Sequence, residues 1–209
     1  GAIWIGTENK GVYKVVENSK GILEFINFRH EVGNENSLTS NSINDLAFDE
    51  NDNLWIATGM GVNYFNIFNG VIERFENNSN LGLVPNGYVS QLFVNSNNEL
   101  WIASYNGLYQ WRPQTKTFSF YNSLPKNVTG VIAKDSMVYF TANKKLYQLN
   151  LENHECIKIP NNEIGLDQIE KIKLLKDNTV LLTGKTGFAS LKTSDLSFKT
   201  DVSKVYWTN

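Results

Sequence analysis

The chain has 209 residues, of which 41% are hydrophobic, 19% are charged and 12% are aromatic, and its formal net charge is −2. A slightly acidic chain without a dense cluster of Lys and Arg lacks the basic footprint that binds phosphates, so we expect no nucleic-acid partner. No apolar run approaches the roughly 18 residues of a membrane-spanning helix, so we expect this stretch not to lie in a membrane. Because Cys156 is the single cysteine, an intrachain disulfide framework is excluded.

Three short segments have nearly the same sequence. They read Ile-Trp-Ile-Gly-Thr at 3–7, Leu-Trp-Ile-Ala-Thr at 54–58 and Leu-Trp-Ile-Ala-Ser at 100–104. Two weaker copies follow, and the aligned positions, 51, 46, 38 and 42 residues apart, are Trp4, Trp55, Trp101, Tyr139 and Leu181. A period near forty made only of strands is typical of a β-propeller with one four-stranded blade per repeat. We therefore predict an all-β fold, a single propeller domain or fragment over 1–209.

The predicted strands follow from this period in chain order. Alternating or apolar runs predict inner strands at 42–49, 88–95, 128–134, 169–175 and 202–208. The repeated segments predict second strands at about 2–7, 53–58, 99–104, 137–142 and 179–184. Asn69-Gly70 is a strong hairpin signal between a third and an outer strand.

A second marker precedes three of the inner strands. Leucine and asparagine stand three residues apart in Leu38…Asn41, Leu83…Asn86 and Leu124…Asn127. We expect the leucine to fill the space between adjacent blades. We expect the asparagine to hydrogen-bond the backbone of its own turn as the strand begins.

The two ends of the chain leave two architectures open. The first blade begins at its second strand, while 202–208 reads as an inner strand without a following blade. Joining these segments would close a five-bladed ring and remove the open edge. Alternatively, the five repeats are an arc of a larger, seven-bladed propeller. Because the chain opens inside a repeat, we interpret it as a piece of a longer protein.

The segment Asn53 to Thr58, with Gly61-Val62 after it and Leu38-x-x-Asn41 before it, resembles the two-component regulator propeller repeat. Residues 1–13 and 83–109 match this pattern nearly as well, whereas the two later copies match by spacing more than by sequence. The resemblance implies that this chain is the periplasmic sensor region of a longer protein. That parent protein would be a bacterial hybrid histidine kinase anchored in the inner membrane. The resemblance also implies that the region senses a poly- or oligosaccharide and is not itself an enzyme.

We expect the recurring residues Trp4, Trp55, Trp101, Tyr139 and Leu181 to form the core between blades, because a residue repeated at one strand position is a packing residue. The turn at 49–53 imitates the start of a calcium loop, but the required glycine and final acidic residue are missing. His30 and His154 have no second ligand at metal spacing. We predict no metal, no cofactor and no catalytic residue.

Ligands usually bind to the loops at one face of a propeller. On a repeat scaffold, we expect the functional residues in the loops that depart from the repeat. The second-to-third strand turns and the segments entering the inner strands supply the candidates. Tyr105 with Asn106 is the preferred pair, because an aromatic face beside an amide suits a sugar. The other candidate ligand-binding residues are Lys10, Arg29, His30, Tyr88 and Lys144.

Two other functions stay open. The blades could form a structural or protein-interaction module that mediates homodimer contacts, because exposed end strands can pair with another chain. A carbohydrate-active enzyme would need two carboxylates that face each other roughly 5–10 Å apart, and no sequence spacing indicates such a pair.

Overall fold

The described residues of this computed structural model, 2–75, 80–176 and 178–192, form five antiparallel sheets, and every strand pairs with its neighbour in sequence. Sheet 1 contains β1 (Ile3–Gly6), β2 (Val12–Glu17) and β3 (Leu23–Phe28). Sheet 2 contains β4 (Ile43–Phe48), β5 (Leu54–Thr58), β6 (Gly61–Asn66) and β7 (Val71–Arg74). Sheet 3 contains β8 (Val89–Val94), β9 (Leu100–Ser104), β10 (Gly107–Arg112) and β11 (Thr117–Phe120). Sheet 4 contains β12 (Val128–Lys134), β13 (Met137–Ala142), β14 (Lys145–Asn150) and β15 (Cys156–Ile159). Sheet 5 contains β16 (Lys171–Leu174), β17 (Thr179–Gly184) and β18 (Gly187–Lys192).

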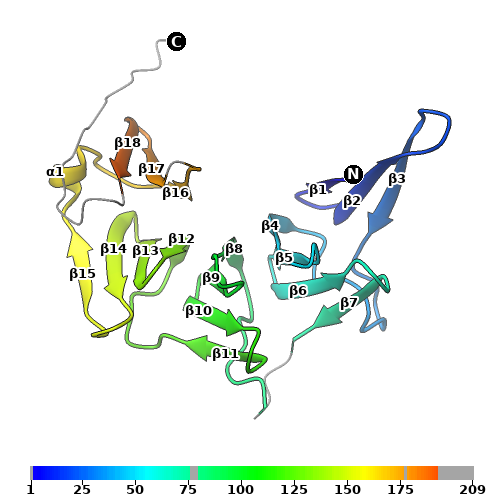
Figure 1. The fold of residues 1–209 in the computed structure, drawn as a ribbon, viewed down its shortest axis with the longest axis horizontal. Helices are drawn as coiled ribbons and strands as arrows, with labels where there is room; N and C mark the ends of the chain where they lie inside the picture. The colour runs from blue at the N-terminus through cyan, green and yellow to red at the C-terminus, as the bar shows by residue number, and fades with distance from the viewer. Residues whose placement is uncertain (1, 76–79, 177, 193–209) are drawn as a thin grey trace.

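The sheets stand side by side in an arc (Figure 1). The inner strands β4, β8, β12 and β16 lie along its inner side, and consecutive members of this series are in contact. Sheets 1 and 5 lie at opposite ends, so the described residues form an open arc and not a closed five-bladed ring. The predicted inner strand at 202–208 lies outside the described residues. The prediction of an all-β propeller architecture is confirmed.

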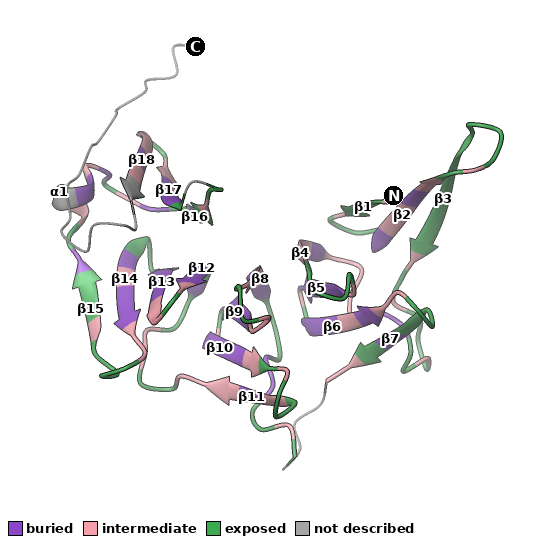
Figure 2. Cartoon of the chain, viewed as in Figure 1, coloured by how far each residue is buried: buried purple, intermediate pink, exposed green. Residues whose placement is uncertain are grey.

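The second strands of the middle sheets are buried on both faces, as Figure 2 shows for β5 and β9. Side chains alternate along a strand, so Leu54 and Ile56 pack toward sheet 1 while Trp55 and Ala57 pack toward sheet 3. This double coverage explains why the repeated segment is continuously apolar instead of alternating. Burying one tryptophan removes roughly 150–250 Å² from water, worth about 4–6 kcal/mol.

The aligned aromatic residues lie in successive seams between sheets. Trp4 is half-buried and packs with Phe65 of sheet 2 at a ring-centroid distance of 5.3 Å. Trp55 is 4% exposed in the seam to sheet 3, and Trp101 is fully buried in the seam to sheet 4. Tyr139 is 9% exposed and lies in the seam to sheet 5.

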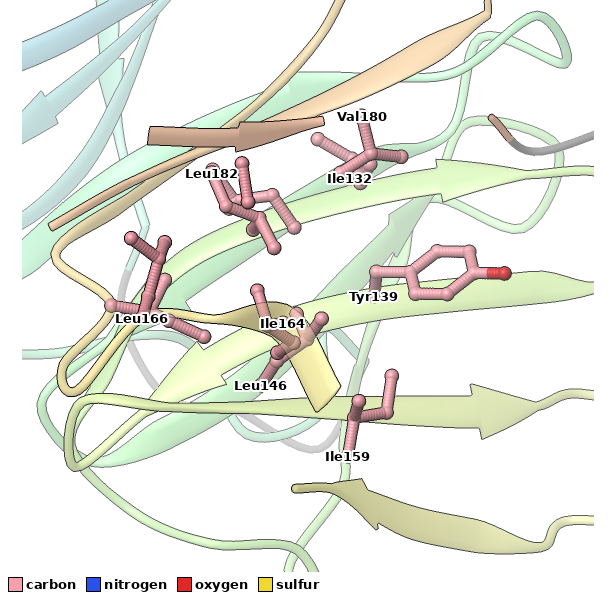
Figure 3. Packing of buried hydrophobic residues seen from close by; sticks show 11 residues of the cluster. Ile132, Tyr139, Leu146, Ile159, Ile164, Leu166, Val180 and Leu182 are labelled. Carbon is pink, nitrogen blue, oxygen red and sulfur yellow. The ribbon is translucent and has the colours of Figure 1, made fainter. Parts of the chain in front are cut away.

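The seam between sheets 4 and 5 shows how the weaker repeats pack (Figure 3). Ile132 and Leu146 of sheet 4 meet Val180 and Leu182 of sheet 5 in one buried cluster. Tyr139 takes the position of the earlier tryptophans in this seam, and aliphatic side chains make up the rest of the cluster. The sheet stacking therefore continues after the tryptophan signature is lost.

A single helical turn, α1 (Asn161–Ile164), interrupts the strand series before β16. The sequence period predicts no helix at this point. The turn starts after Pro160, whose fixed φ suits a helix start, and ends at Gly165 in the left-handed region at φ 73°. It places Ile164, which is fully buried, in the seam between sheets 4 and 5. Sheet 5 therefore starts at Lys171, two residues later than predicted.

The leucine marker is confirmed in one copy and corrected in another. Leu38 is fully buried in the seam between sheets 1 and 2. Leu83, however, is 58% exposed, and its neighbour Val84, at 3% exposure, fills the next seam. Gly87, at φ 88°, adds a turn residue before β8, so the buried position shifts by one residue.

The asparagine of the marker was expected to bond its own turn, and this prediction is wrong. The Asn41 side chain accepts a hydrogen bond from the backbone N–H of His30, eleven residues earlier (2.8 Å). The Asn127 side-chain amide donates to the Asn143 side chain of the neighbouring turn (3.3 Å). These asparagines join separate segments instead of capping one turn.

Polar side chains of the inner strands tie neighbouring sheets together. β4, β8 and β12 each have a β-bulge near their start, at Asn44, Ser90 and Thr129. The Asn44 amide donates to the Val89 carbonyl oxygen (2.7 Å), and the Ser90 hydroxyl donates to that of Val128 (2.8 Å). Asn44 and Ser90 thus bond the start of the next inner strand, whereas the Thr129 hydroxyl bonds Thr141 of its own sheet.

The residue after each bulge makes a second bond of the same kind. The Asp45 carboxylate accepts a hydrogen bond from the Leu92 backbone N–H (2.9 Å). The side-chain oxygen of Gln91, Oε1, accepts one from the Val131 backbone N–H (3.1 Å). The equivalent position in β12 is Gly130, which has no side chain. Because Gly130 leaves space there, the side-chain amide of Gln91 reaches beyond sheet 4. It donates a hydrogen bond to the Ile172 carbonyl oxygen in sheet 5 (3.3 Å). Gln91 bridges three sheets.

Before β8, Val84 is buried in place of Leu83. We therefore predict that truncating the smaller residue, Val84, destabilises the protein more than truncating the larger one, Leu83. We expect Val84→Ala to lower the free energy of unfolding by about 2 kcal/mol, because it empties buried volume. Leu83→Ala removes a larger but exposed side chain, and we expect a change within about 0.5 kcal/mol. Urea unfolding followed by tryptophan fluorescence measures both values. A larger loss for Leu83→Ala would contradict the assignment.

A side chain at Gly130 should break the bridge made by Gln91. A Cβ there would lie 2.6 Å from Ile172 Cγ2 and 2.7 Å from Gln91 Oε1. We expect Gly130→Ala to cost about 1–3 kcal/mol, as overpacking does. Gly59→Ala is the control, since its Cβ would meet nothing closer than 3.6 Å. Equal unfolding free energies for the two variants would refute this account.

Candidate functional site

The predicted candidates lie at one end of the sheets, here called the loop face. It is formed by the turns between second and third strands and by the segments that enter the inner strands. Antiparallel pairing brings these two kinds of segment together, because second strands end where inner strands begin. Backbone hydrogen bonds join them, as between the Tyr105 N–H and the Tyr88 carbonyl oxygen (2.9 Å).

Tyr88 and Tyr105 form an exposed aromatic pair on the loop face. Their side chains are 52% and 62% exposed, and the backbone bond between the two residues holds their Cα atoms close. Two exposed aromatic rings on adjoining segments offer apolar surface of the kind that packs against ring C–H groups of a sugar.

Asn106, the preferred partner of Tyr105, is occupied by a structural contact. Its side-chain amide donates to the Asn86 carbonyl oxygen at 2.8 Å and reaches the Asn86 side chain at 3.3 Å. The amide N–H groups thus hold the segment that enters β8 and so position Tyr88. The expected sugar-binding role of Asn106 is not supported by this geometry.

His30 and Arg29 belong to a separate network in the segment between β3 and β4. The His30 ring nitrogen Nδ1 contacts the Leu38 carbonyl oxygen at 2.7 Å. The Arg74 guanidinium donates to the carbonyl oxygens of Ser37 (2.6 Å) and Leu38 (2.8 Å) and clamps this segment onto sheet 2. The Arg29 side chain is exposed. His30 is therefore a half-buried structural contact of the clamp.

Lys10 and Lys144 lie on turns of different sheets. Lys10 is exposed, and its carbonyl oxygen accepts a bond from the Asn27 side-chain amide (2.9 Å). Lys144 adopts the left-handed region at φ 62°, and its ammonium donates to the Gln168 side chain (2.8 Å). The structure thus brings together Tyr88, Tyr105 and Asn106 and leaves the other candidates in separate contacts.

A concavity lies on the inner side of the arc, and the sequence pattern did not predict it. This axial cavity of about 580 Å³ is bounded by β4, β8, β12 and β16. Its polar wall is formed by the bulge residues and their neighbours, with two lysines from β16 and a threonine from β17: Asn44, Asp45, Ser90, Gln91, Thr129, Lys171, Lys173 and Thr183. Asn44, Ser90 and Thr129 stand next to the strand starts, so the cavity reaches the loop face.

Asp45 is the acidic residue of this cavity. Its two carboxylate oxygens accept hydrogen bonds from the backbone N–H groups of Leu46 and Leu92, both at 2.9 Å. Burial raises the pKa of Asp45 above its ordinary value, although these bonds and the charges of Lys171 and Lys173 act to lower it. The carboxylate is thus committed to joining sheets 2 and 3 in a poorly solvated position.

Leu181, predicted as a core residue between blades, lies on the face of sheet 5 that is turned away from sheet 4. It is half-buried and lines the axial cavity instead of a described seam between sheets. The buried residues of the same strand, Val180 and Leu182, face sheet 4. Because alternate residues face opposite ways, Leu181 points away from sheet 4.

Two smaller concavities lie at the opposite end of the sheets. One, of about 440 Å³, has Trp111 and Tyr64 in its wall, and the Tyr64 hydroxyl donates to Asp49 (3.0 Å). The segment 49–53 is confirmed as a hairpin turn by the pairing of β4 with β5 on either side of it and by the Asp49 N–H bond to the Asn53 carbonyl oxygen (3.0 Å). The other, of about 400 Å³, includes Arg112 and His154 in its wall.

Within the part of the chain that the structure describes, no group of three His, Cys, Asp or Glu side chains could hold a metal ion. No helix in that part is long and apolar enough to cross a bilayer.

The raised pKa of Asp45 predicts a pH dependence of stability. The folded state binds this proton more tightly than the unfolded state, so the contribution of Asp45 to the unfolding free energy rises as pH falls through its folded pKa. Asp45→Asn removes this titration. We expect the stability of the wild type relative to Asp45→Asn to increase from roughly pH 7 toward pH 4. Urea unfolding at each pH measures it, and a relative stability that falls with pH would contradict the prediction.

Comparison with known proteins agrees with the repeat pattern. Residues 37–60 match the family described as two component regulator propeller. No curated protein matches the chain. The extracellular domain of a putative hybrid two component system from B. thetaiotaomicron is a similar structure, with 18% identity and a TM-score of 0.75. The alignment covers 100% of this chain and 27% of that one, so the present chain spans about a quarter of its length.

Two further structures support the fold. The extracellular domain of a putative one component system from the same organism is 18% identical, with a TM-score of 0.59 over 91% of this chain and 30% of the other. A catalytically inactive virginiamycin B lyase from Staphylococcus aureus is 15% identical, with a TM-score of 0.62 over 94% and 64%. At these identities the likeness establishes the fold. The resemblance found in the sequence is confirmed: this chain is a β-propeller arc in which residues 37–60 match the two component regulator propeller repeat.

Proposed function

We propose that this chain is a non-catalytic, extracytoplasmic sensor module of a bacterial two-component signalling protein, and that it senses a poly- or oligosaccharide. The observation that carries the proposal is the matching repeat at 37–60 in a fold similar to the extracellular domain of a putative hybrid two component system. In this proposal the module lies in the periplasm. The parent protein is a hybrid histidine kinase anchored in the inner membrane.

The geometry of the loop face supports a sugar ligand. Tyr88 and Tyr105 present exposed rings close to the strand starts that border the axial cavity. A sugar needs an apolar surface for its C–H groups and hydrogen-bonding groups for its hydroxyls. The tyrosines supply the first. The donors of Asn44, Ser90 and Gln91 are engaged between strands, so the cavity wall supplies the second mainly through hydroxyl oxygens, which can still accept hydrogen bonds, as at Ser90 and Thr183.

The commitment of Asp45 supports a binding role instead of hydrolysis. A glycosidase uses two carboxyl groups that face the bond to be cleaved. Both oxygens of Asp45, the carboxylate that lines the axial cavity, are bonded to backbone N–H groups. This carboxylate is therefore positioned for structure and not for proton transfer to a ligand.

A second candidate function, a protein-interaction module, is favoured by the outer face of sheet 1. Ile3 and Phe25 are 66% and 61% exposed there. By repeat position they correspond to Leu54 and Ile72, which are buried between sheets 1 and 2. An apolar face of this kind suits a further blade or a second copy of the chain, as in a homodimer.

The sugar-binding proposal is tested by removing the aromatic pair. Isothermal titration calorimetry against a panel of oligosaccharides should find a ligand, and Tyr88→Ala/Tyr105→Ala should weaken its binding by about tenfold or more, which is the loss of roughly 1.4 kcal/mol. Phe68→Ala is the matched control, because Phe68 is a fully exposed aromatic residue in the β6–β7 turn at the other end of sheet 2.

Three outcomes count against the proposal. An absence of binding across a broad panel would refute direct sugar recognition by this chain. An equal loss in the Phe68 control would show a nonspecific effect. Loss of binding on Trp111→Phe, with the tyrosine variant unchanged, would move the site to the concavity between sheets 2 and 3.

A further inference from the structure

The axial cavity contains two positive charges on one strand. Lys171 and Lys173 of β16 are both exposed and both line the cavity, while Ile172 between them is 2% exposed and packs into the seam with sheet 4. Alternate residues of a strand project to the same side, about 6.5 Å apart. The two ammonium groups therefore project from neighbouring points of the same wall.

These charges are not neutralised by the protein. Among the residues that the structure describes, no carboxylate lies within 4.0 Å of either ammonium nitrogen. Asp45, on β4 across the cavity, is close enough for the two lysines to lower its pKa, but its oxygens are bonded to the backbone of Leu46 and Leu92. The cavity therefore has a net positive charge, with two ammonium groups free to bind an anion.

The remaining wall suits a polyhydroxylated molecule. Gln91, Ser90 and Thr129 border the cavity from β8 and β12, and Thr183 borders it from β17. A volume of about 580 Å³ is within the range of roughly 300–1,000 Å³ that small-molecule sites occupy. The donors of Gln91 and Ser90 are engaged between strands, but the hydroxyl oxygens of Ser90 and Thr183 can accept bonds from a sugar. Such acceptors next to a pair of ammonium groups form a site for a sugar that carries a negative charge.

We propose that the axial cavity binds the carboxylate of an acidic sugar unit, a uronic acid, through Lys171 and Lys173. This inference rests on the proposed function and specifies the chemical class of the saccharide. The acidic unit occupies the cavity, and the neighbouring units of the chain extend toward Tyr88 and Tyr105 on the loop face. An ammonium pair binds a carboxylate through charge-assisted hydrogen bonds, which are stronger than those to neutral groups.

The test compares one oligosaccharide in two charge states. Calorimetric titration with trigalacturonic acid and with its methyl ester changes the charge while keeping the sugar skeleton. We expect the acid to bind at least tenfold more tightly than the ester at low ionic strength. This preference should shrink as salt is added, because salt screens exposed charges.

The matched variants remove the same charge from two places. Lys171→Gln/Lys173→Gln should abolish the preference for the acid while leaving the affinity for the ester within about twofold. Lys145→Gln/Lys158→Gln removes two exposed lysines of sheet 4 outside the cavity and should keep the preference. Melting curves of both variants should match the wild type, because all four side chains are exposed.

The outcomes separate this inference from the proposed function. Equal affinity for acid and ester, or binding of neutral oligosaccharides alone, would overturn the acidic-sugar site while sugar sensing stands. An equal loss of preference in both lysine variants would show a long-range charge effect and would also overturn it. If no saccharide of either charge binds, the proposed function fails together with this inference.

Discussion

Burial of sheet faces against one another is the interaction on which the rest of this structure depends. A four-stranded sheet has two faces, and in sheets 2 to 4 both are covered by neighbours. Trp55 and Trp101 fill the seams where the repeat is strong, and aliphatic residues such as Ile132 and Leu182 do so where it is weak. The stacking tolerates this exchange because burial is non-directional and depends on the apolar area removed from water. The arc in turn decides where every loop end lies.

The inner strands combine packing with polar contacts, and these contacts shape the axial cavity. The bulges at Asn44 and Ser90 interrupt the regular alternation of side chains, so that two consecutive polar residues bond the next inner strand. Each hydrogen bond contributes about 1 kcal/mol, but together they set the spacing between strands. Gly130 then allows sheet 5 to approach Gln91. The polar wall of the cavity is therefore a consequence of how neighbouring sheets are joined.

The loop face and the axial cavity are two candidate surfaces with different chemistry. The exposed rings of Tyr88 and Tyr105 offer apolar contact, and Lys171 and Lys173 offer charge. Asn106 and His30 contribute indirectly, since their bonds hold the segments that enter β8 and β4. A sensor of this design would read a saccharide with residues from several sheets, and ligand binding would affect how adjacent sheets are held together.

The sequence by itself determined the strand series, because the spacing of Trp4, Trp55 and Trp101 and the turns between them are local signals. It also pointed to Tyr105 on an exposed turn. Three things were decided by the tertiary structure. Val84 and not Leu83 became the seam residue, since the inserted turn at Gly87 shifts the buried position. Asn106 lost its free amide to Asn86, a partner twenty residues away. The axial cavity is lined by both Asp45 and Lys171, which are more than a hundred residues apart, and only the curvature of the stacked sheets brings such distant charges to one surface.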